Sequence, residues 1–199
     1  GNYLVLAASL IGVTSLIYDA KGNPAGQVLM VMFSMLYGVI SYKFAYYGEM
    51  ATYLGMTAPM SVFALVSWLR NPHNGNKAEV EIARLKKAEI FNMVVLAVIV
   101  TVVFYFILRA FNTSNLVSST ASVTTSFLAV YMTYKRSTFF ALAYAANDII
   151  LIVLWTLAAL SDISYIPVIT CFVLFLINDI YTFINWTRMH KRQEISQTV

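Results

Sequence analysis

Long apolar stretches alternate with short polar segments along nearly the whole chain. An α-helix needs about 20 consecutive, mostly apolar residues to cross a bilayer, and seven stretches are long enough. Turn-forming residues separate several of them: 22–24 follow the first, Gly48 stands in a short turn before the third, and 71–75 end the third sharply. The charged segment 77–89 is predicted to form a helical lead-in to the fourth. The predicted spans are 2–19, 24–43, 49–70, 88–110, 115–134, 138–160 and 163–187.

The composition agrees with this pattern. Hydrophobic residues make up 60% of the 199 residues and charged residues 11%, with a mean hydropathy of +0.73. A soluble domain has about 45–50% apolar and about 25% charged residues, so the composition indicates an integral membrane protein in a lipid bilayer. Cys171 lies in an apolar run and indicates neither a disulfide framework nor a metal site.

The basic residues stand in short segments between the spans, which is typical of membrane orientation and not of a nucleic-acid partner. Only Lys43 and Arg109 would lie on the outer side if the N-terminus is outside. We therefore expect a multi-pass protein with its N-terminus outside and its C-terminus inside. The basic residues on the inner side would be Lys21, Arg70, Lys77, Arg84, Lys86, Lys87, Lys135, Arg136, Arg188, Lys191 and Arg192.

The chain also contains signs of an internal repeat. Ser67-Trp68-Leu69-Arg70 closes the third span and Asn185-Trp186-Thr187-Arg188 closes the seventh, while Lys21 and Lys135 follow the first and fifth. Two three-helix units separated by one helix point the same way across a membrane. The predicted fold is therefore all-α, with seven transmembrane helices as parallel 3+1+3 repeats: residues 1–70, a linker 71–114, and residues 115–199. Trp68 itself is interpreted as an interface anchor.

A polar and aromatic stripe runs along the sixth span. Tyr144, Asn147, Asp148 and Trp155 fall within an arc of roughly 100° on a helix. An acid at membrane depth usually faces the bundle interior or a water-filled path, and is a functional-site hypothesis by default. The alternative is that Asn147 and Asp148 only hydrogen-bond to neighbouring helices.

The seventh span repeats this pattern, with Asp179 at the edge of its polar face, and the second span adds Tyr37. Glu49, near the outer end of the third span, is interpreted as solvated. No Lys or Arg lies deep in a span, so Asp148 and Asp179 are predicted to be protonated, to accept hydrogen bonds, or to meet a cationic or hydroxyl-rich solute. Aromatic faces would add stacking and cation–π contacts. The candidate substrate-binding residues are Tyr37, Asn147, Asp148, Trp155, Asn178, Asp179, Tyr181, Asn185 and Trp186.

Enzyme chemistry has little support in the sequence. His73 and His190 both stand in predicted inner loops, so no histidine pair could hold a metal within the membrane. No nucleophile–histidine arrangement, phosphate-binding glycine loop or nucleotide-binding motif occurs. We expect no catalytic residue, no metal and no cofactor. A membrane-embedded enzyme or a receptor subunit would need a catalytic group or a binding domain that the chain lacks.

Several motifs follow one another along nearly the whole chain: Tyr47-Gly48-Glu49-Met50, Ala58-Pro59-Met60, Ala145-Ala146-Asn147-Asp148 with Leu154-Trp155, the run from Asn178 to Trp186, and the ending from Arg188 to Gln193. Together they resemble the PnuC family of nicotinamide riboside transporters. Ser61 departs from the family, where glutamine often follows the Pro-Met pair.

The resemblance implies a 3+1+3 arrangement like that of the SWEET sugar carriers, in a homotrimer of the bacterial inner membrane. It also implies facilitated diffusion of nicotinamide riboside, with trapping by a cytoplasmic ribosylnicotinamide kinase for NAD synthesis. The residue types leave open a carrier of this kind for thiamine, riboflavin or another nucleoside, and they leave open proton coupling through the carboxylates.

Overall fold

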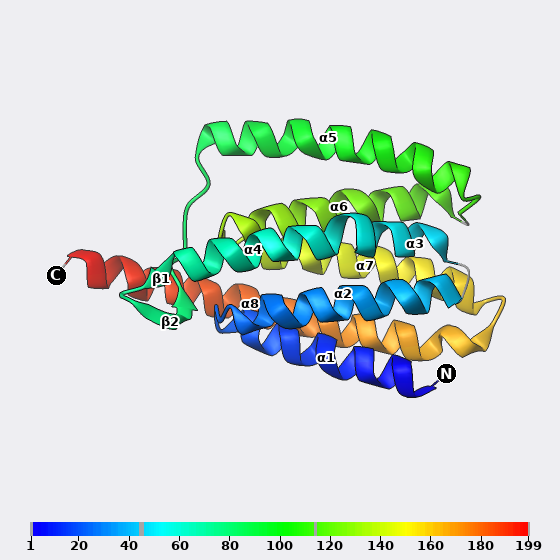
Figure 1. Cartoon of the computed structure of the whole chain (residues 1–199), viewed down its shortest axis with the longest axis horizontal. Coiled ribbons are helices and arrows are strands. Elements are labelled where there is room, and N and C mark those ends of the chain that lie inside the picture. Colours follow the sequence, from blue (N-terminus) through cyan, green and yellow to red (C-terminus); the bar gives the residue numbers. More distant parts are fainter. Residues whose placement is uncertain (1, 44–45, 114, 199) are drawn as a thin grey trace.

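The computed structural model of the chain describes residues 2–43, 46–113 and 115–198, and it is almost entirely helical (Figure 1). Each predicted span corresponds to one helical segment, and the third is continuous through a single π-helical turn. The elements are α1 (Asn2–Ala20), α2 (Ala25–Lys43), α3 (Tyr47–Thr52), the π-helical turn (Tyr53–Thr57), α4 (Ala58–Arg70), β1 (Pro72–His73), β2 (Asn76–Val80), α5 (Lys87–Ala110), α6 (Leu116–Tyr134), α7 (Phe140–Ala159), a 3₁₀ turn (Ile163–Tyr165) and α8 (Ile166–Thr198).

Within the described residues, six of the seven spans are long and apolar enough to cross a membrane by themselves. The remaining one, α6, has the same 19-residue length as α1 but is rich in serine and threonine. Many of its hydroxyls bond inside the bundle: those of Thr120 and Thr124 donate to carbonyls one turn back, and those of Ser122 and Ser126 donate to α7. A helix whose polar groups are satisfied in this way can cross a membrane beside apolar partners. The prediction of seven spans is confirmed.

Six of these segments form a closed ring. α1 packs on α2, α2 on α4, α4 on α6, α6 on α7, α7 on α8, and α8 returns to α1. α5 lies outside the ring, where it packs mainly on α6 and exposes most of its apolar side chains (Figure 1). The contacts among α1, α2 and α4 recur in the same order among α6, α7 and α8. The predicted 3+1+3 arrangement is confirmed.

Reciprocal hydrogen bonds join the two repeats at one end of the ring. The indole Nε1 of Trp68, in α4, donates to the carbonyl of Thr133 at the end of α6 at 2.9 Å. In the same way Nε1 of Trp186, in α8, donates to the carbonyl of Asp19 at the end of α1 at 2.8 Å. The two indole rings lie 5.4 Å apart and both side chains are fully buried. The interpretation of Trp68 as an interface anchor is wrong, because its N–H satisfies a helix-terminal carbonyl in the protein interior.

The neighbouring residues repeat the same exchange. Ser67 donates to the carbonyl of Tyr134 at 2.8 Å, and Asn185 donates to the carbonyl of Ala20 at 2.6 Å. Carbonyls in the last turn of a helix have no partner within that helix. The third helix of each repeat therefore caps the first helix of the other, and the matching sequences at the ends of α4 and α8 reflect this shared task.

A β-hairpin occupies part of the segment predicted to be a helical lead-in. β1 and β2 pair antiparallel, and Asn74 and Gly75 both have positive φ in the turn between them, as a tight hairpin turn requires. Residues 81–86 are not helical, and α5 begins only at Lys87. The prediction of a helix over 77–89 is wrong for its first ten residues. The prediction that 71–75 end the third span is confirmed, whereas Gly48 lies inside α3 and not in a turn before it.

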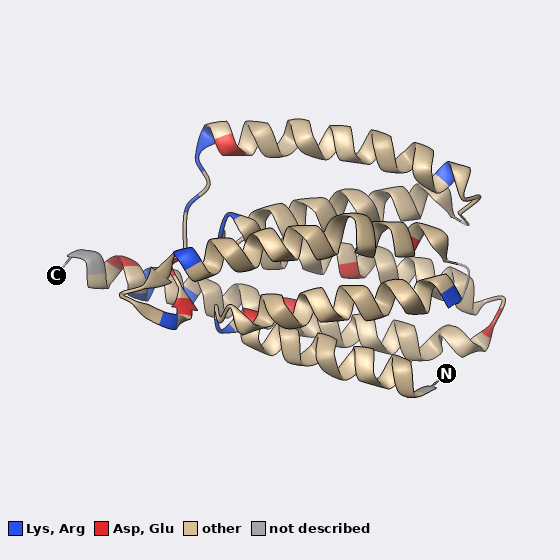
Figure 2. Cartoon of the chain, in the orientation of Figure 1, with Lys and Arg blue, Asp and Glu red and all other residues tan. Residues whose placement is uncertain are grey.

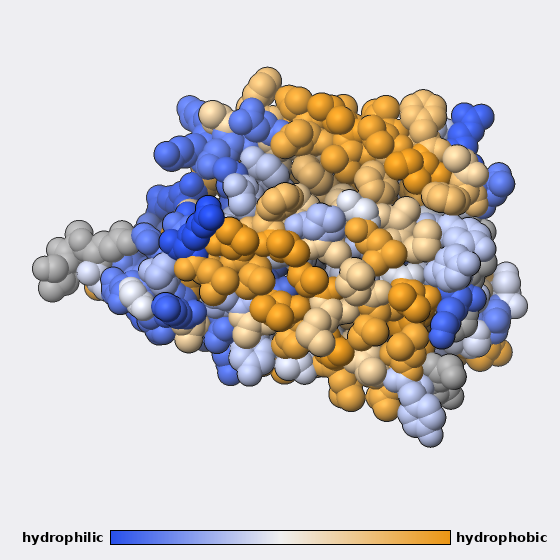
Figure 3. Space-filling view, in the orientation of Figure 1, coloured by the Kyte–Doolittle hydropathy of each residue, from blue (hydrophilic) through white to orange (hydrophobic). Residues whose placement is uncertain are grey.

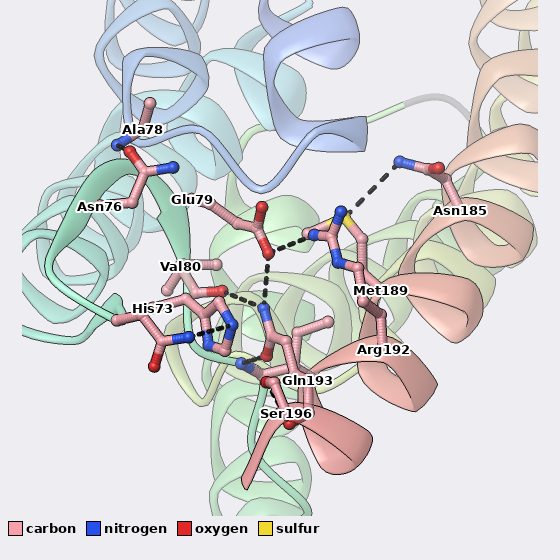
Figure 4. Close-up of polar contacts among 12 residues, drawn as sticks. His73, Asn76, Ala78, Glu79, Val80, Asn185, Met189, Arg192, Gln193 and Ser196 are labelled. Atoms are coloured by element: carbon pink, nitrogen blue, oxygen red, sulfur yellow. Dashed lines mark hydrogen bonds and ion pairs between the residues drawn. The ribbon is translucent and has the colours of Figure 1, made fainter. Parts of the chain in front are cut away.

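The C-terminal part of α8 holds this hairpin in place (Figure 4). Gln193 is buried, and its amide donates to the carbonyl of Val80 at 3.0 Å and to a carboxylate oxygen of Glu79 at 2.9 Å, while it accepts from the N–H of Ile82 at 2.9 Å. Arg192 also pairs with Glu79. Partial burial alone would raise the pKa of Glu79, but the bonds from Gln193 and Arg192 outweigh it and lower that pKa below its usual value.

The surface carries a broad apolar band between two polar ends (Figure 3). Lys and Arg gather mainly at the end with the hairpin and the last turns of α8, which we call the hairpin end (Figure 2). The opposite end, where α1 begins, is the N-terminal end. This distribution is that of a multi-pass membrane protein whose ends reach water on both sides.

Candidate functional site

The interior of the ring contains a small cavity of about 40 Å³ with a mixed lining of apolar and polar side chains, which we call the central cavity. Asn147 and Asp148 reach it from α7, Asp179 from α8, Ser126 from α6, and Tyr53 from the π-helical turn. A volume of this size holds about one water molecule. The central cavity is therefore closed to a larger solute in this conformation.

Local backbone chemistry explains why Tyr53 points inward. Pro59 has no N–H, and its ring crowds the carbonyl four residues earlier. The turn before it widens, so that the N–H of Ala58 donates to the carbonyl of Tyr53 five residues back. This extra residue in the turn brings both Tyr53 and Thr57 onto the wall of the central cavity.

Three hydroxyl groups of α6 orient Asn147. Ser122 and Ser126 donate to its Oδ1 at 3.2 and 3.0 Å. The hydroxyl of Thr125 lies 2.9 Å from the same oxygen, and its single hydrogen is shared with carbonyls of its own helix. These contacts all end on one oxygen, so they orient the amide, and its nitrogen is the group left to meet a solute. Hydrogen bonding to neighbouring helices and a place on the cavity wall therefore occur together at this residue.

Asp148 and Asp179 both line the central cavity and are close neighbours there. Two carboxyl groups so close together do not readily carry two negative charges. Oδ2 of Asp148 is buried without a hydrogen-bond partner in the described part of the chain. The ion pairs among the described residues lie at the hairpin end, away from this pair. The cavity thus offers two acidic groups without a protein cation.

A second and larger cavity, of about 520 Å³, opens toward the N-terminal end between α1, α2, α7 and α8. We call it the aromatic cavity, because Tyr37, Trp155 and Tyr165 line it. Its size is within the range of ordinary small-molecule pockets. Phe33, Phe172 and Phe175 belong to the walls of both the aromatic and the central cavity. These three rings therefore separate a space large enough for a small solute from the carboxyl pair.

The nine predicted site residues fall into three groups, according to which cavity they line, if any. Asn147, Asp148 and Asp179 line the central cavity, and Tyr37 and Trp155 line the aromatic cavity. The other four candidates lie away from both walls.

Of those four, Tyr181 is 56% exposed on the outer face of α8. Asn178 is half-buried and bonds to Thr182 in the next turn. Asn185 and Trp186 cap α1 at the hairpin end.

Some residues of the cavity walls were not among the candidates. Tyr53, Thr57 and Ser126 line the central cavity. The sequence signal for them is a hydroxyl at membrane depth on the same helical faces as other polar residues. Glu49, interpreted as solvated, is only 5% exposed. That interpretation is wrong, because the segment after α5 folds over Glu49. Glu49 and Thr113 line a third cavity, separate from the central one.

A ring of membrane-length helices around internal cavities is an architecture typical of membrane transporters. The family model described as nicotinamide mononucleotide transporter matches residues 2–188. The chain belongs to this transporter family.

Two similar proteins agree with that assignment. The chain is 26% identical over 196 residues to the nicotinamide riboside transporter PnuC of Neisseria mucosa, covering 96% of this chain and 74% of the relative. It superimposes on a crystal structure of the vitamin B3 transporter PnuC with a TM-score of 0.82, at 24% identity, covering 97% of this chain and 84% of the other. The second likeness supports the fold.

Proposed function

We propose that this protein carries nicotinamide riboside across the membrane by facilitated diffusion. The observation that carries the proposal is the buried Asp148–Asp179 pair, which has an unpartnered oxygen and lies next to an aromatic cavity. Nicotinamide riboside is a flat pyridinium cation joined to ribose. A carboxylate offsets its charge, aromatic faces bind the ring, and the amide of Asn147 can bond to the carboxamide or a ribose hydroxyl.

The charge of the cavities favours the riboside over the mononucleotide. The walls of the central cavity, the aromatic cavity and a third cavity around Glu49 include Asp148, Asp179, Glu49 and Asp162 but no Lys or Arg. A phosphate group near these carboxylates would be repelled and would lack its usual basic partners. We therefore infer that the mononucleotide binds much more weakly than the riboside.

The proposed mechanism is alternating access, with residues 1–70 and 115–199 rocking against each other and 71–114 joining them. In the present conformation the Trp68–Trp186 contact closes the hairpin end, and the larger cavity lies at the N-terminal end. The solute would enter the aromatic cavity, displace the rings of Phe33, Phe172 and Phe175, and reach the carboxyl pair. Rocking would then part the two tryptophans and release it at the hairpin end.

The distribution of Lys and Arg supports an orientation with the hairpin end in the cytoplasm and the N-terminus outside, in the bacterial inner membrane (Figure 2). A cytoplasmic ribosylnicotinamide kinase would then trap the solute by phosphorylation. We also propose a homotrimer, for which the exposed apolar face of α5 offers contact area.

Uptake into vesicles that contain the purified protein tests this function. We expect labelled nicotinamide riboside to equilibrate across the membrane without an imposed proton gradient, and to accumulate only when kinase and ATP are enclosed. Excess thiamine, riboflavin or nicotinamide mononucleotide should compete poorly. Preferred uptake of thiamine, or uptake that requires a proton gradient, would contradict the proposal.

A further inference from the structure

We propose that the N-terminal end carries a second site, specific for an organic cation, in a cavity of about 270 Å³ around Glu49. We call it the outer site. The role given to it below, as a first binding place for the solute, rests on the proposed function, whereas its affinity for a cation does not. Glu49 and Tyr46 of the α3 region, Thr113, Asp162 and Tyr165 line it.

This cavity differs from the two described above. It shares no lining residue with the central cavity, and it shares Tyr165 with the aromatic cavity. Its walls come from α3, the segment between α5 and α6, the end of α7 and the following 3₁₀ turn. It lies at the N-terminal end, so a solute approaching from that side would meet it before the interior.

Two buried polar atoms in this cavity lack partners. The side chain of Glu49 is 5% exposed, and its Oε2 has no hydrogen-bond partner among the described residues. Oγ1 of Thr113 is also buried and has no hydrogen-bond partner among the described residues. Gly48 makes this arrangement possible, because a Cβ there would lie 2.9 Å from that Oγ1 and 2.5 Å from a methyl of Leu108. A buried carboxylate normally has a partner, so its absence within the chain indicates a bound group from outside.

Aromatic rings and a second acid complete the site. The ring centroid of Tyr46 lies 5.6 Å from that of Tyr165, with the two ring planes at 89°, and 4.7 Å from that of Trp155. The rings of Trp155 and Tyr165 are 5.4 Å apart. Asp162 is at the exposed mouth, where the backbone N–H of Ser164 donates to it and lowers its pKa, so it is charged at neutral pH. Neighbouring aromatic faces with two carboxyls and no basic side chain on the wall suit a pyridinium or a quaternary ammonium group.

The outer site also lies next to the interior. Tyr53 follows Glu49 by four residues, so both lie on the same side of the helix, and Tyr53 reaches the central cavity. The hydroxyl of Tyr53 is within electrostatic range of both Glu49 and Asp148. A cation released from the outer site therefore has an acidic and aromatic route to the carboxyl pair, and the outer site would speed its association.

The Glu49→Gln variant tests the outer site, because it keeps the shape of the side chain and removes its charge. The probe is 1-methylnicotinamide, which has the flat cation but no ribose, and its binding to the purified protein is measured by saturation-transfer NMR. We expect binding to the variant to be about tenfold weaker and binding to Asp148→Asn to be affected less. Glu194→Gln, at the hairpin end, makes the same charge change and should bind as the wild type does.

A kinetic measurement tests the role in transport. Stopped-flow fluorescence should show that Glu49→Gln slows association of nicotinamide riboside and removes most of the dependence on ionic strength. The uncharged reduced riboside should associate equally with both proteins. If Glu49→Gln fails to fold, Asp162→Asn at the mouth should give the same changes to a smaller degree.

The outcomes separate the two proposals. If Glu49→Gln binds 1-methylnicotinamide as tightly as the wild type does, the outer site is overturned, whether or not the riboside is transported. The same holds for Asp162→Asn if that variant is needed. Loss of 1-methylnicotinamide binding in Glu49→Gln, in a protein that does not transport the riboside, would support the outer site and reject the proposed function.

Discussion

Replacing either tryptophan at the hairpin end should open that end of the protein. Trp68→Phe and Trp186→Phe each remove one indole N–H, which leaves the carbonyl of Thr133 or of Asp19 without its donor. Loss of the partner of a buried polar group costs about 1–3 kcal/mol. Both bonds hold the hairpin end closed and so stabilise the present conformation over the one in which the hairpin end is open. A loss of about 1–2 kcal/mol should lower the ratio of the closed to the open conformation roughly 5- to 30-fold.

The chain has a native reporter of this shift. Cys171 is its single cysteine and lies on the wall of the aromatic cavity, half-buried. A membrane-impermeant maleimide added from the N-terminal side should label it in the wild type, and more slowly in either variant, because opening of the hairpin end closes the aromatic cavity. The variant Cys171→Ala is the control for specific labelling.

The two single variants should have similar effects, since the two bonds correspond to each other in the repeats. Labelling of Cys171 at the wild-type rate in both variants would refute the idea that the tryptophans hold the hairpin end closed. Faster labelling would refute the direction of the shift.

Three further predictions concern the hairpin end and the repeat interior. Gln193→Ala should lower the free energy of unfolding by about 1–3 kcal/mol, measured by thermal unfolding in detergent, and the exposed Lys191→Ala should not. Because the pKa of Glu79 is lowered, its stabilising contacts should persist at neutral pH and weaken as the pH falls below about 4.3; proteolysis of 71–86 that is equally slow at pH 3.5 and 7 would contradict this. In Gly26→Ala, a new Cβ would lie 2.1 Å from Oδ1 of Asp19, so unfolding should become easier by about 1–3 kcal/mol, and unchanged stability would be the opposing result.

The limits of most helices could be predicted because membrane thickness sets their length, although α8 continues to Thr198, well beyond the predicted end at 187. The predicted span 24–43 and α2 at Ala25–Lys43 differ by one residue. The repeat could be predicted as well, since Trp68 and Trp186 perform the same contact in each half. The role of Trp68 could not be inferred from its position alone, because a tryptophan near the end of a span is equally typical of a lipid interface.

The hairpin was missed because charged residues at short spacing fit an exposed helix as well as a strand. Contacts distant in sequence decide between them: the N–H of Val80 donates to the carbonyl of Gly22, and Gln193 bonds to the following backbone. The local signal for the hairpin was Asn74-Gly75, which favours a two-residue turn.

The candidates on α7 all line a cavity, whereas of those on α8 only Asp179 does. The face chosen on α8 was too wide: Asp179 and Trp186 are buried, whereas Tyr181 lies about 140° around the helix from the middle of the buried arc. The sequence shows which residues share one face of a helix. It does not show which part of a broad polar face packs against the neighbouring helices. Glu49 was misjudged for the same reason, since only the folded segment near Thr113 covers it.

Calorimetric binding of nicotinamide riboside to the wild type and to Asp148→Asn tests whether the buried carboxyl pair recognises the cation. We expect saturable binding to the wild type, binding at least about tenfold weaker to Asp148→Asn, and little difference between the two proteins for the uncharged reduced riboside. Equal affinity of the two proteins for the riboside, or no binding by the wild type, would contradict the claim that the buried carboxyl pair recognises the cation.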